Sequence, residues 1–379
     1  MLDILTNCYR LELLTVNCDT NGSNYTATIE QLIESRGFNY EKHYIETKDG
    51  YILGVYRLIN PFVDQSSRST LKPIVLQHGF LGVGSDFLIN APANLCYDAW
   101  ISNSRGNGYS RNHTTLNPDK DSEFWKFTID ELIAYDTPAV IDYVLNQTGF
   151  CWIGHSQGSM VMFGLLSEKP EYSAKVEPFI ALAPVFYVQH LDSSLKYLVK
   201  VPGLLWAARY LEGELSKPKL LAAISYNCVT WIGEKCESLL NSFLGLSLAN
   251  LNSYSDNIAT STSTSLWNLV HFGQNIKSGK FHKFDFGKAE NERRYGQSIP
   301  PVYQLSKINS TSIALFYSKS DIFTDPEDVS QLIKDIQVPL IRDYCIDSPS
   351  WDHYDYLFAK DSYKYINSII TEILSTFSN

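Results

Sequence analysis

Residues 37–60 contain two strand-like runs of hydrophobic residues with a polar turn between them. The runs lie at 43–47 and 51–58. Lys48-Asp49-Gly50 separates them, and Asp-Gly is a strong signal for a tight turn between paired strands. The pattern predicts a β-hairpin near the start of the chain.

Short apolar runs then alternate with helical patterns. The apolar runs have the length and the flanking turns of buried strands, and they lie at 73–77, 99–101, 150–153, 176–182, 313–317 and 340–346. The helical patterns lie at 129–145, with Pro138 as a kink or restart, and at 157–167, 326–336 and 360–377. Strands that alternate with helices indicate an α/β fold with a mainly parallel sheet.

The pattern changes between residues 186 and 303. This segment is rich in loops, carries a Ser/Thr run at 260–265, and has helical stretches rich in Leu, Trp and Tyr. The strand and helix pattern resumes after it. We therefore expect an α/β core at 37–185 and 304–379, a mostly helical cap inserted at 186–303, and an N-terminal extension at 1–36.

Composition limits the classes of protein to which the chain can belong. It has 379 residues, of which 44% are hydrophobic, enough to bury a large core. The formal net charge of −10 argues against a nucleic-acid partner. No apolar run reaches the ~18 residues of a transmembrane segment. No Cys-x-x-Cys pair occurs, and we expect no metal and no cofactor.

The N-terminus and the modification signals leave the cellular location open. The first residues lack a basic segment, and polar residues interrupt the stretch that is apolar in a signal peptide. Either the protein is not exported, or this start is a processed one. Asn-x-Ser/Thr sequences, which mark glycosylation sites in exported proteins, occur at Asn21, Asn24, Asn112, Asn146 and Asn309.

Gly154-His-Ser-Gln-Gly158 matches the G-x-S-x-G sequence of a nucleophile elbow. It follows an apolar strand and opens a helix, which is the strand–turn–helix setting of such an elbow. The elbow Ser has a strained backbone, and a Cβ at either flanking position would collide with a neighbouring strand or helix. The pattern predicts a nucleophile at Ser156.

A serine hydroxyl is a weak nucleophile and needs a base, which an acid in turn orients. In the fold class that carries this elbow, the chain order is Ser, then acid, then His. Among the eight histidines, only His353 follows a late strand, in the loop before the last helix. We therefore expect His353 to be the base.

Three aspartates follow the strand at 313–317 and compete for the role of the acid. Asp325 precedes a proline, which is a helix N-cap signal, and Asp328 lies in the first turn of the same predicted helix. Asp321 lies nearer the carboxyl end of the strand, where ligands meet open α/β sheets. We favour Asp321.

Acyl transfer through a serine needs two backbone N–H donors aimed at the developing oxyanion. One should be the N–H of Gln157, directly after the nucleophile and at the start of its helix. The other should be the N–H of Phe80, in the His78-Gly79-Phe80 loop after the strand at 73–77. An ordinary strand-ending turn at His78-Gly79 is the alternative.

The sequence resembles the acid lipase family of α/β-hydrolases, the group that contains gastric lipase and lysosomal acid lipase. The matching strings extend from about residue 44 to the C-terminus; they are Thr47-Lys-Asp-Gly-Tyr-Ile-Leu53, Leu76-Gln-His-Gly79, Asn103-Ser-Arg-Gly-Asn107, Glu123-Phe-Trp125, Tyr135-Asp-Thr-Pro-Ala139, Gly154-His-Ser-Gln-Gly158, Lys277-Ser-Gly-Lys-Phe281, Asp325-Pro-Glu-Asp-Val329 and His353-Tyr-Asp-Tyr356. The resemblance implies an α/β-hydrolase fold and the roles already assigned to Ser156, Asp321, His353, Phe80 and Gln157.

The resemblance also implies hydrolysis of neutral lipid esters, triacylglycerols or sterol esters, at a lipid–water interface, by a secreted or lysosomal glycoprotein. Cys228 and Cys236 lie where the family has a disulfide in the cap. Two segments are shorter than the family pattern, between Gly82 and Trp100 and just before residue 150. They motivate an alternative, a lipid-binding protein of the hydrolase fold with little or no turnover.

Overall fold

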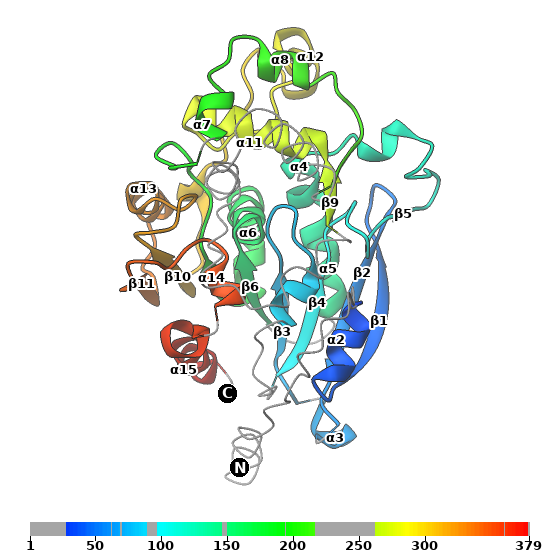
Figure 1. The fold of residues 1–379 in the computed structure, drawn as a ribbon, viewed down its shortest axis with the longest axis vertical. Helices are drawn as coiled ribbons and strands as arrows, with labels where there is room; N and C mark the ends of the chain where they lie inside the picture. The colour runs from blue at the N-terminus through cyan, green and yellow to red at the C-terminus, as the bar shows by residue number, and fades with distance from the viewer. Residues whose placement is uncertain are drawn as a thin grey trace, which may run out of the picture.

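The computed structural model describes residues 28–61, 63–68, 70–88, 97–145, 150–193, 195–216, 262–359 and 361–377. Nine strands form one sheet (Figure 1); they are β1 (Asn39–Glu46), β2 (Tyr51–Ile59), β3 (Pro73–Gln77), β4 (Asp98–Ser102), β5 (Asn112–His113), β6 (Phe150–His155), β7 (Val176–Leu182), β10 (Ile313–Ser318) and β11 (Arg342–Ile346). The order is β1–β2–β4–β3–β6–β7–β10–β11, with β5 paired to β2. Each strand from β4 onward in this spatial order is parallel to the next one. Strand β2 pairs antiparallel with β1, β4 and β5.

The predicted hairpin and the predicted parallel strands are confirmed. β1 and β2 pair from Glu46 and Ile52 at the turn to Asn39 and Ile59 at the open end. The strands at 73–77 and 176–182 have the predicted bounds, whereas β6 continues through Gly154 to His155. The short β5 was not predicted, because a two-residue strand has no periodicity to recognise.

Helices cover both faces of the sheet (Figure 1). Those outside the cap are α2 (Ile29–Ser35), α3 (Gln65–Arg68), α4 (Ile129–Glu131), α5 (Thr137–Val144), α6 (Gln157–Glu168), α13 (Pro326–Ile336), α14 (Asp355–Phe358) and α15 (Ser368–Thr376). The helix predicted at 360–377 begins with a π-helical turn, Tyr363–Asn367, and continues as α15. α2 lies inside the segment expected as an extension, and its Ile29, Leu32 and Ile33 are buried.

The helix predicted at 129–145 is divided into three parts. α4 passes into a π-helical segment, Leu132–Asp136, and α5 follows with Pro138 in its first turn. Pro lacks the N–H that an uninterrupted α-helix would use, and a π-helical turn precedes it. The junction residues Leu132, Asp136 and Thr137 have right-handed helical backbone angles, so the segment stays helical through Pro138.

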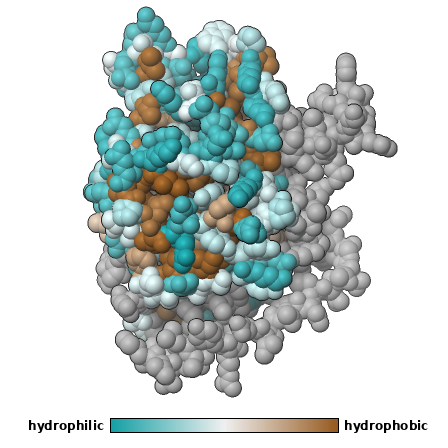
Figure 2. All heavy atoms as spheres, turned by 90° about the vertical axis from the view of Figure 1, so that its left-hand side faces the viewer, coloured by the Kyte–Doolittle hydropathy of each residue, from teal (hydrophilic) through white to brown (hydrophobic). Residues whose placement is uncertain are grey.

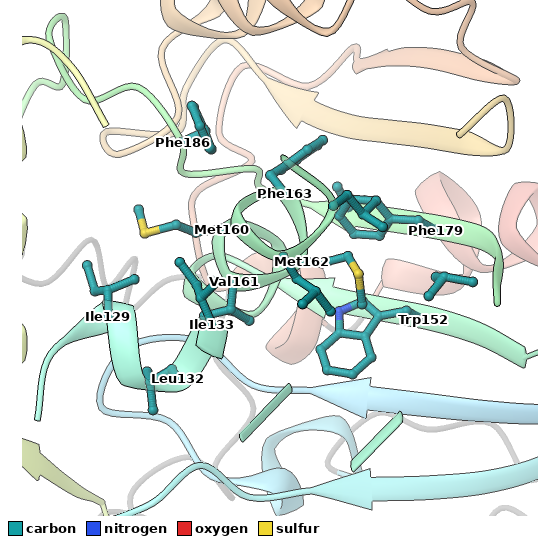
Figure 3. Close-up of a cluster of buried hydrophobic side chains, with 14 of the residues drawn as sticks. Ile129, Leu132, Ile133, Trp152, Met160, Val161, Met162, Phe163, Phe179 and Phe186 are labelled. Atoms are coloured by element: carbon teal, nitrogen blue, oxygen red, sulfur yellow. The ribbon is translucent and has the colours of Figure 1, made fainter. Parts of the chain in front are cut away.

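Helix α6 lies at the centre of the main hydrophobic core (Figure 3). All of its residues from Gln157 to Ser167 are buried, as expected for a helix that is apolar on every side. Its Gly164 lets the π-helical segment approach closely, since a Cβ there would lie 2.4 Å from the Ile133 side chain. Trp152 of β6 donates its indole N–H to the Gly158 carbonyl oxygen at 3.1 Å. The strand before the elbow and the helix after it are therefore rigidly packed.

The described part of the chain between β7 and β10, called the cap below, lies toward one end of the molecule (Figure 1, top). Its described elements are α7 (Leu195–Leu198), α8 (Leu204–Ala208), β8 (Glu214–Ser216), β9 (Ser263–Ser265), α11 (Leu266–Ser278) and α12 (Lys288–Tyr295). Part of the Ser/Thr run forms a strand that was not predicted, because Ser263–Ser265 pairs with β8. Ser265 also caps α11 by accepting the Trp267 N–H at 3.0 Å, a common use of Ser at helix starts.

Strand β11 forms one edge of the sheet. Figure 2 shows this side of the molecule, where hydrophobic residues gather in the middle of the face. Ile341, directly before β11, is 36% exposed. Charged residues on an edge strand oppose pairing with another chain, and β11 opens with Arg342 and Asp343.

Candidate active site

Ser156 occupies a sharp turn between β6 and α6. Its φ of +56° and ψ of −117° are unusual for a residue with a side chain and cost ~1–3 kcal/mol. A Cβ at Gly154 would lie 2.4 Å from the Gly158 carbonyl oxygen, and a Cβ at Gly158 would lie 2.2 Å from that of Gln77. Both contacts are too short for any other residue, so the strained turn and the need for two glycines are confirmed.

A chain of hydrogen bonds joins Ser156, His353 and Asp321. The Ser156 Oγ lies 2.8 Å from the His353 Nε2, and the His353 Nδ1 lies 2.9 Å from the nearer Asp321 oxygen. All three residues are at most 6% exposed. An imidazole held in this way can take the serine proton on one side while a carboxylate stabilises the resulting charge on the other.

The loop after β10 holds the Asp321 carboxylate in place. Its Oδ1 accepts the N–H groups of Phe323 at 2.8 Å and Thr324 at 3.1 Å. Burial by itself raises the pKa of Asp321, but the His353 ring and these donors outweigh it and lower the pKa below its usual value. The group therefore remains ionised in mildly acidic conditions.

The two competing aspartates have other partners. Asp325 caps α13 by accepting the Glu327 N–H at 2.7 Å, as its sequence context predicts. Asp328 accepts the His190 N–H at 3.0 Å, and its other oxygen lies 2.8 Å from the His190 Nδ1. Of the three aspartates, Asp321 is the one that contacts His353.

The loop after β3 runs directly beside the serine. A Cβ on Gly79 would lie 2.9 Å from the Ser156 Cβ, so only glycine fits there without a shift. Phe80 follows in this loop, and Gln157 lies at the start of α6. Within the described residues, neither the Phe80 N–H nor the Gln157 N–H donates to a protein atom. Two backbone donors beside the serine are thus left for a ligand.

His78 has a structural part in this loop that the sequence did not indicate. Its Nε2 accepts the Ser104 N–H at 3.0 Å, so its Nδ1 carries the proton and donates to the Gly79 carbonyl oxygen at 2.8 Å. Burial lowers the pKa of His78 to about 4, which keeps the ring neutral. His78 therefore helps to fix the loop that carries Phe80, and a hydrogen bond from the Gly82 N–H to the Gly79 carbonyl oxygen at 3.1 Å closes a turn around Phe80.

Known proteins resemble this chain over most of its length. Two family models match it, the partial alpha/beta-hydrolase lipase region at residues 29–91 and the alpha/beta hydrolase fold at residues 72–360. Lipase member K of Homo sapiens is 33% identical and covers 88% of this chain and 87% of its own. Lysosomal acid lipase/cholesteryl ester hydrolase of Macaca fascicularis is 32% identical over 95% of this chain and 96% of its own.

The chain belongs to the acid lipase family of α/β-hydrolases. The crystal structure of VinJ is similar in fold, with a TM-score of 0.51, 13% identity, and coverage of 88% of this chain and 98% of that one. The expected fold class, an α/β-hydrolase fold with a mainly parallel sheet, is therefore confirmed.

The remaining predicted residues of this acid lipase family member fall into two groups. Asn112 and Asn309 are exposed, so their side chains are accessible for glycosylation. Asn21, Asn24, Asn146, Cys228 and Cys236 lie outside the described residues. Within the described ranges, no cluster of three metal-binding side chains occurs, and no helix is long and apolar enough to cross a membrane.

Proposed function

We propose that the protein hydrolyses carboxylic esters of neutral lipids, triacylglycerols or sterol esters, through an acyl-enzyme on Ser156. The proposal rests chiefly on one observation, the 2.8 Å contact between the Ser156 Oγ and the His353 Nε2, with Asp321 on the far side of the ring. It is supported by the family, whose members include a cholesteryl ester hydrolase and a gastric triacylglycerol lipase.

In the first step, the Ser156 Oγ attacks the ester carbonyl carbon while the His353 Nε2 takes its proton. Asp321 holds the His353 Nδ1–H and stabilises the imidazolium. The imidazolium gives its proton to the leaving alcohol, and the acyl group stays on Ser156. A water molecule, deprotonated by His353, then attacks the acyl-enzyme, and the fatty acid leaves as Ser156 regains its proton.

The carbonyl oxygen becomes negative in both tetrahedral intermediates. We assign its stabilisation to the N–H groups of Phe80 and Gln157. Gln157 is at the start of α6, where the helix dipole also favours negative charge. Removal of one side-chain donor from such a hole costs about 10²–10³ in kcat in another hydrolase.

The cap offers a surface for a lipid–water interface. Between α7 and the residues after α8, large apolar side chains point into solvent: Tyr197 is 64% exposed, Trp206 61%, Tyr210 62% and Leu211 58%. The Arg209 guanidinium lies 5.3 Å from the Trp206 ring and 5.0 Å from the Tyr210 ring. Aromatic rings next to cations suit the boundary between headgroups and acyl chains.

We place the protein among secreted or lysosomal glycoproteins. The support is the relative named lysosomal acid lipase, together with the exposed sequons at Asn112 and Asn309. Secretion from a eukaryotic host and a shift in mass after removal of N-glycans would agree with this. An unglycosylated secreted protein would contradict it.

The function is tested with a fluorophosphonate probe on the wild type and on Ser156→Ala. We expect the wild type to be labelled, and to release fatty acid from a triacylglycerol emulsion, a sterol ester or a short-chain ester. Ser156→Ala should do neither while it keeps the wild-type melting temperature. A folded wild type that binds these lipids but is neither labelled nor active would instead be the lipid-binding alternative.

A further inference from the structure

We propose that helix α11 of the cap positions both oxyanion donors, Gln157 through Asn268 and Phe80 through Phe272. The inference rests on the proposed function, because it concerns how these two N–H groups are aimed. Asn268 and Phe272 are four residues apart and therefore lie on the same face of α11, one turn from each other. Each of them contacts one of the two residues that carry the proposed donors.

The first contact is a hydrogen bond between buried amides. The Gln157 Nε2 donates to the Asn268 Oδ1 at 2.8 Å, and the Asn268 Nδ2 donates to the Thr264 Oγ1 at 2.9 Å. Gln157 is 4% exposed, Asn268 1% and Thr264 6%. Loss of a partner here leaves a buried amide unsatisfied, which costs more than the bond itself contributes. The Gln157 side chain therefore has one preferred position, set by the cap.

The second contact is an aromatic pair. The rings of Phe80 and Phe272 meet edge to face, with centroids 5.1 Å apart and planes at 71°. This is a favourable geometry for two rings. Both residues are half-buried, so the pair also covers the loop that contains Phe80.

Helix α11 can hold these residues because the core anchors its beginning. The Ser263 Oγ donates to the Gly106 carbonyl oxygen at 2.7 Å, and the Ser265 Oγ donates to that of Trp125. Further along, the His271 Nε2–H donates to the His282 carbonyl oxygen at 2.7 Å. The position of α11 over the site is thus set by several bonds that do not involve Gln157 or Phe80.

A change in the direction of these N–H groups should act on the transition state. Hydrogen bonds from these N–H groups stabilise the ester carbonyl of the bound substrate only weakly, whereas the oxyanion depends on both of them for its stabilisation. Loss of the positioning contacts should therefore lower kcat and leave KM nearly unchanged. If Asn268 had only a structural role, its replacement would lower the melting temperature without lowering kcat at a nearly constant KM.

The test is a double-mutant cycle on a soluble short-chain ester, with Asn268→Ala, Gln157→Ala and the double variant. Gln157→Ala keeps the backbone N–H and removes only the side chain that orients it. We expect each single variant to lose about tenfold in kcat, with KM within about twofold of the wild type. The double variant should lose no more than either single one, because both remove the same contact.

Two further variants separate positioning from folding. Asn275→Ala removes another fully buried Asn of α11, one whose Oδ1 accepts the His282 N–H and not a bond from Gln157. It should melt at a lower temperature yet keep kcat within about twofold of the wild type. Asn268→Asp retains the acceptor oxygen for Gln157 and should recover most of the lost kcat. Phe272→Ala should lower kcat through Phe80 in the same way.

Three outcomes would overturn the inference: full kcat in Asn268→Ala, losses that multiply in the double variant, or an equal loss in Asn275→Ala. In each of these cases the wild type still hydrolyses the ester and Ser156→Ala does not, so the proposed function stands. If the folded wild type neither reacts with the fluorophosphonate nor hydrolyses the ester, the proposed function fails and the inference fails with it.

Discussion

The His155 Nε2–H donates a hydrogen bond to the backbone carbonyl oxygen of His353, with 2.7 Å between the two atoms. The rings of these residues lie 4.9 Å apart, and both residues are buried. Burial, and then the neighbouring His353 ring, lowers the pKa of His155 to about 3. His155 is therefore a neutral donor under ordinary conditions. Because His155 directly precedes Ser156, its bond holds the loop of His353, the proposed base, close to the proposed nucleophile.

Replacement of His155 by Ala should lower kcat by about 10–100-fold, because a displaced loop moves the His353 imidazole away from Ser156. His155 is already neutral above about pH 4, so its removal should not move the pH dependence of kcat/KM in that range. Kinetics from pH 4.5 to 8 measure both effects. His155→Gln, whose amide can also donate, should recover part of the rate. A displaced pH profile in His155→Ala would contradict the positioning role.

Gly79→Ala should slow catalysis with little effect on global stability. The added methyl would lie 2.9 Å from the Ser156 Cβ and 3.2 Å from the His155 Nδ1, so the loop with Phe80 must move away from the serine. We expect a loss of about tenfold or more in both kcat and the rate of fluorophosphonate labelling. Gly37→Asn is the control, since a Cβ there meets nothing within 4 Å and its φ of +80° suits Asn. Equal rates in the two variants would contradict the prediction.

Elements with strong local signals could be predicted from the sequence. The Asp-Gly turn predicted the β1–β2 hairpin, and Asp325-Pro326 predicted the start of α13. The strand β9, within the Ser/Thr run, was not predicted because it depends on its pairing with β8, across a long stretch of chain. Propensity and periodicity describe neighbours in sequence, so they do not detect a strand that only a distant partner stabilises.

The same limit applies to the site. The elbow motif and the chain order of the fold class pointed to Ser156, Asp321 and His353, and the structure brings these side chains together. The supporting residues His78 and Asn268 had no such signal, because their roles arise from contacts to Ser104 and Gln157, which are distant in sequence. The one feature of the sequence that points to such supports is position, since His78 and His155 lie directly beside Gly79 and Ser156.

Arg105→Met should destabilise the fold strongly. The Arg105 side chain is fully buried, pairs with Asp49 and Asp136 at 2.6 Å, and lies 3.9 Å from the Tyr51 ring centroid. Its loss leaves the buried Asp136 and the partly exposed Asp49 without a cation, and removal of one partner of a buried ion pair typically costs about 3–5 kcal/mol. Urea unfolding measures the change in the free energy of unfolding.

Arg57→Met is the matched control for that experiment. Arg57 also pairs with two carboxylates, Asp98 at 2.6 Å and Glu41 at 3.1 Å, but its side chain is 26% exposed. Solvent screens the Arg57–Glu41 pair, and the buried Asp98 keeps the Trp100 indole N–H as a donor at 3.0 Å, so we expect a smaller loss of about 1 kcal/mol. An Arg105 variant no less stable than the Arg57 variant would show that the buried pairs do not stabilise the fold.

The junction between α4 and the cap should lose stability as the pH rises. Asp130 accepts the Phe284 N–H at 2.8 Å and the Tyr303 hydroxyl at 2.6 Å. Burial nevertheless raises its pKa from 3.8 to about 6, more than these donors lower it. The folded protein thus holds a proton that the unfolded chain has released. The resulting stabilisation is complete below about pH 4 and is lost as the pH rises through 6.

Asp130→Asn should remove this dependence, because Asn keeps an acceptor for Phe284 without a titrating proton. Between pH 4 and 7 the wild type should lose about 1–2 kcal/mol more than the variant. The full pKa shift of Asp130 would give a larger loss of stability. Its side chain is 15% exposed, however, and solvent reduces that loss. Melting temperatures across this range measure the difference. Asp142→Asn, which changes an exposed carboxylate of α5 paired with Lys175, should retain the wild-type slope. If both variants follow the wild-type curve, the pKa of Asp130 is not raised and burial does not control its titration.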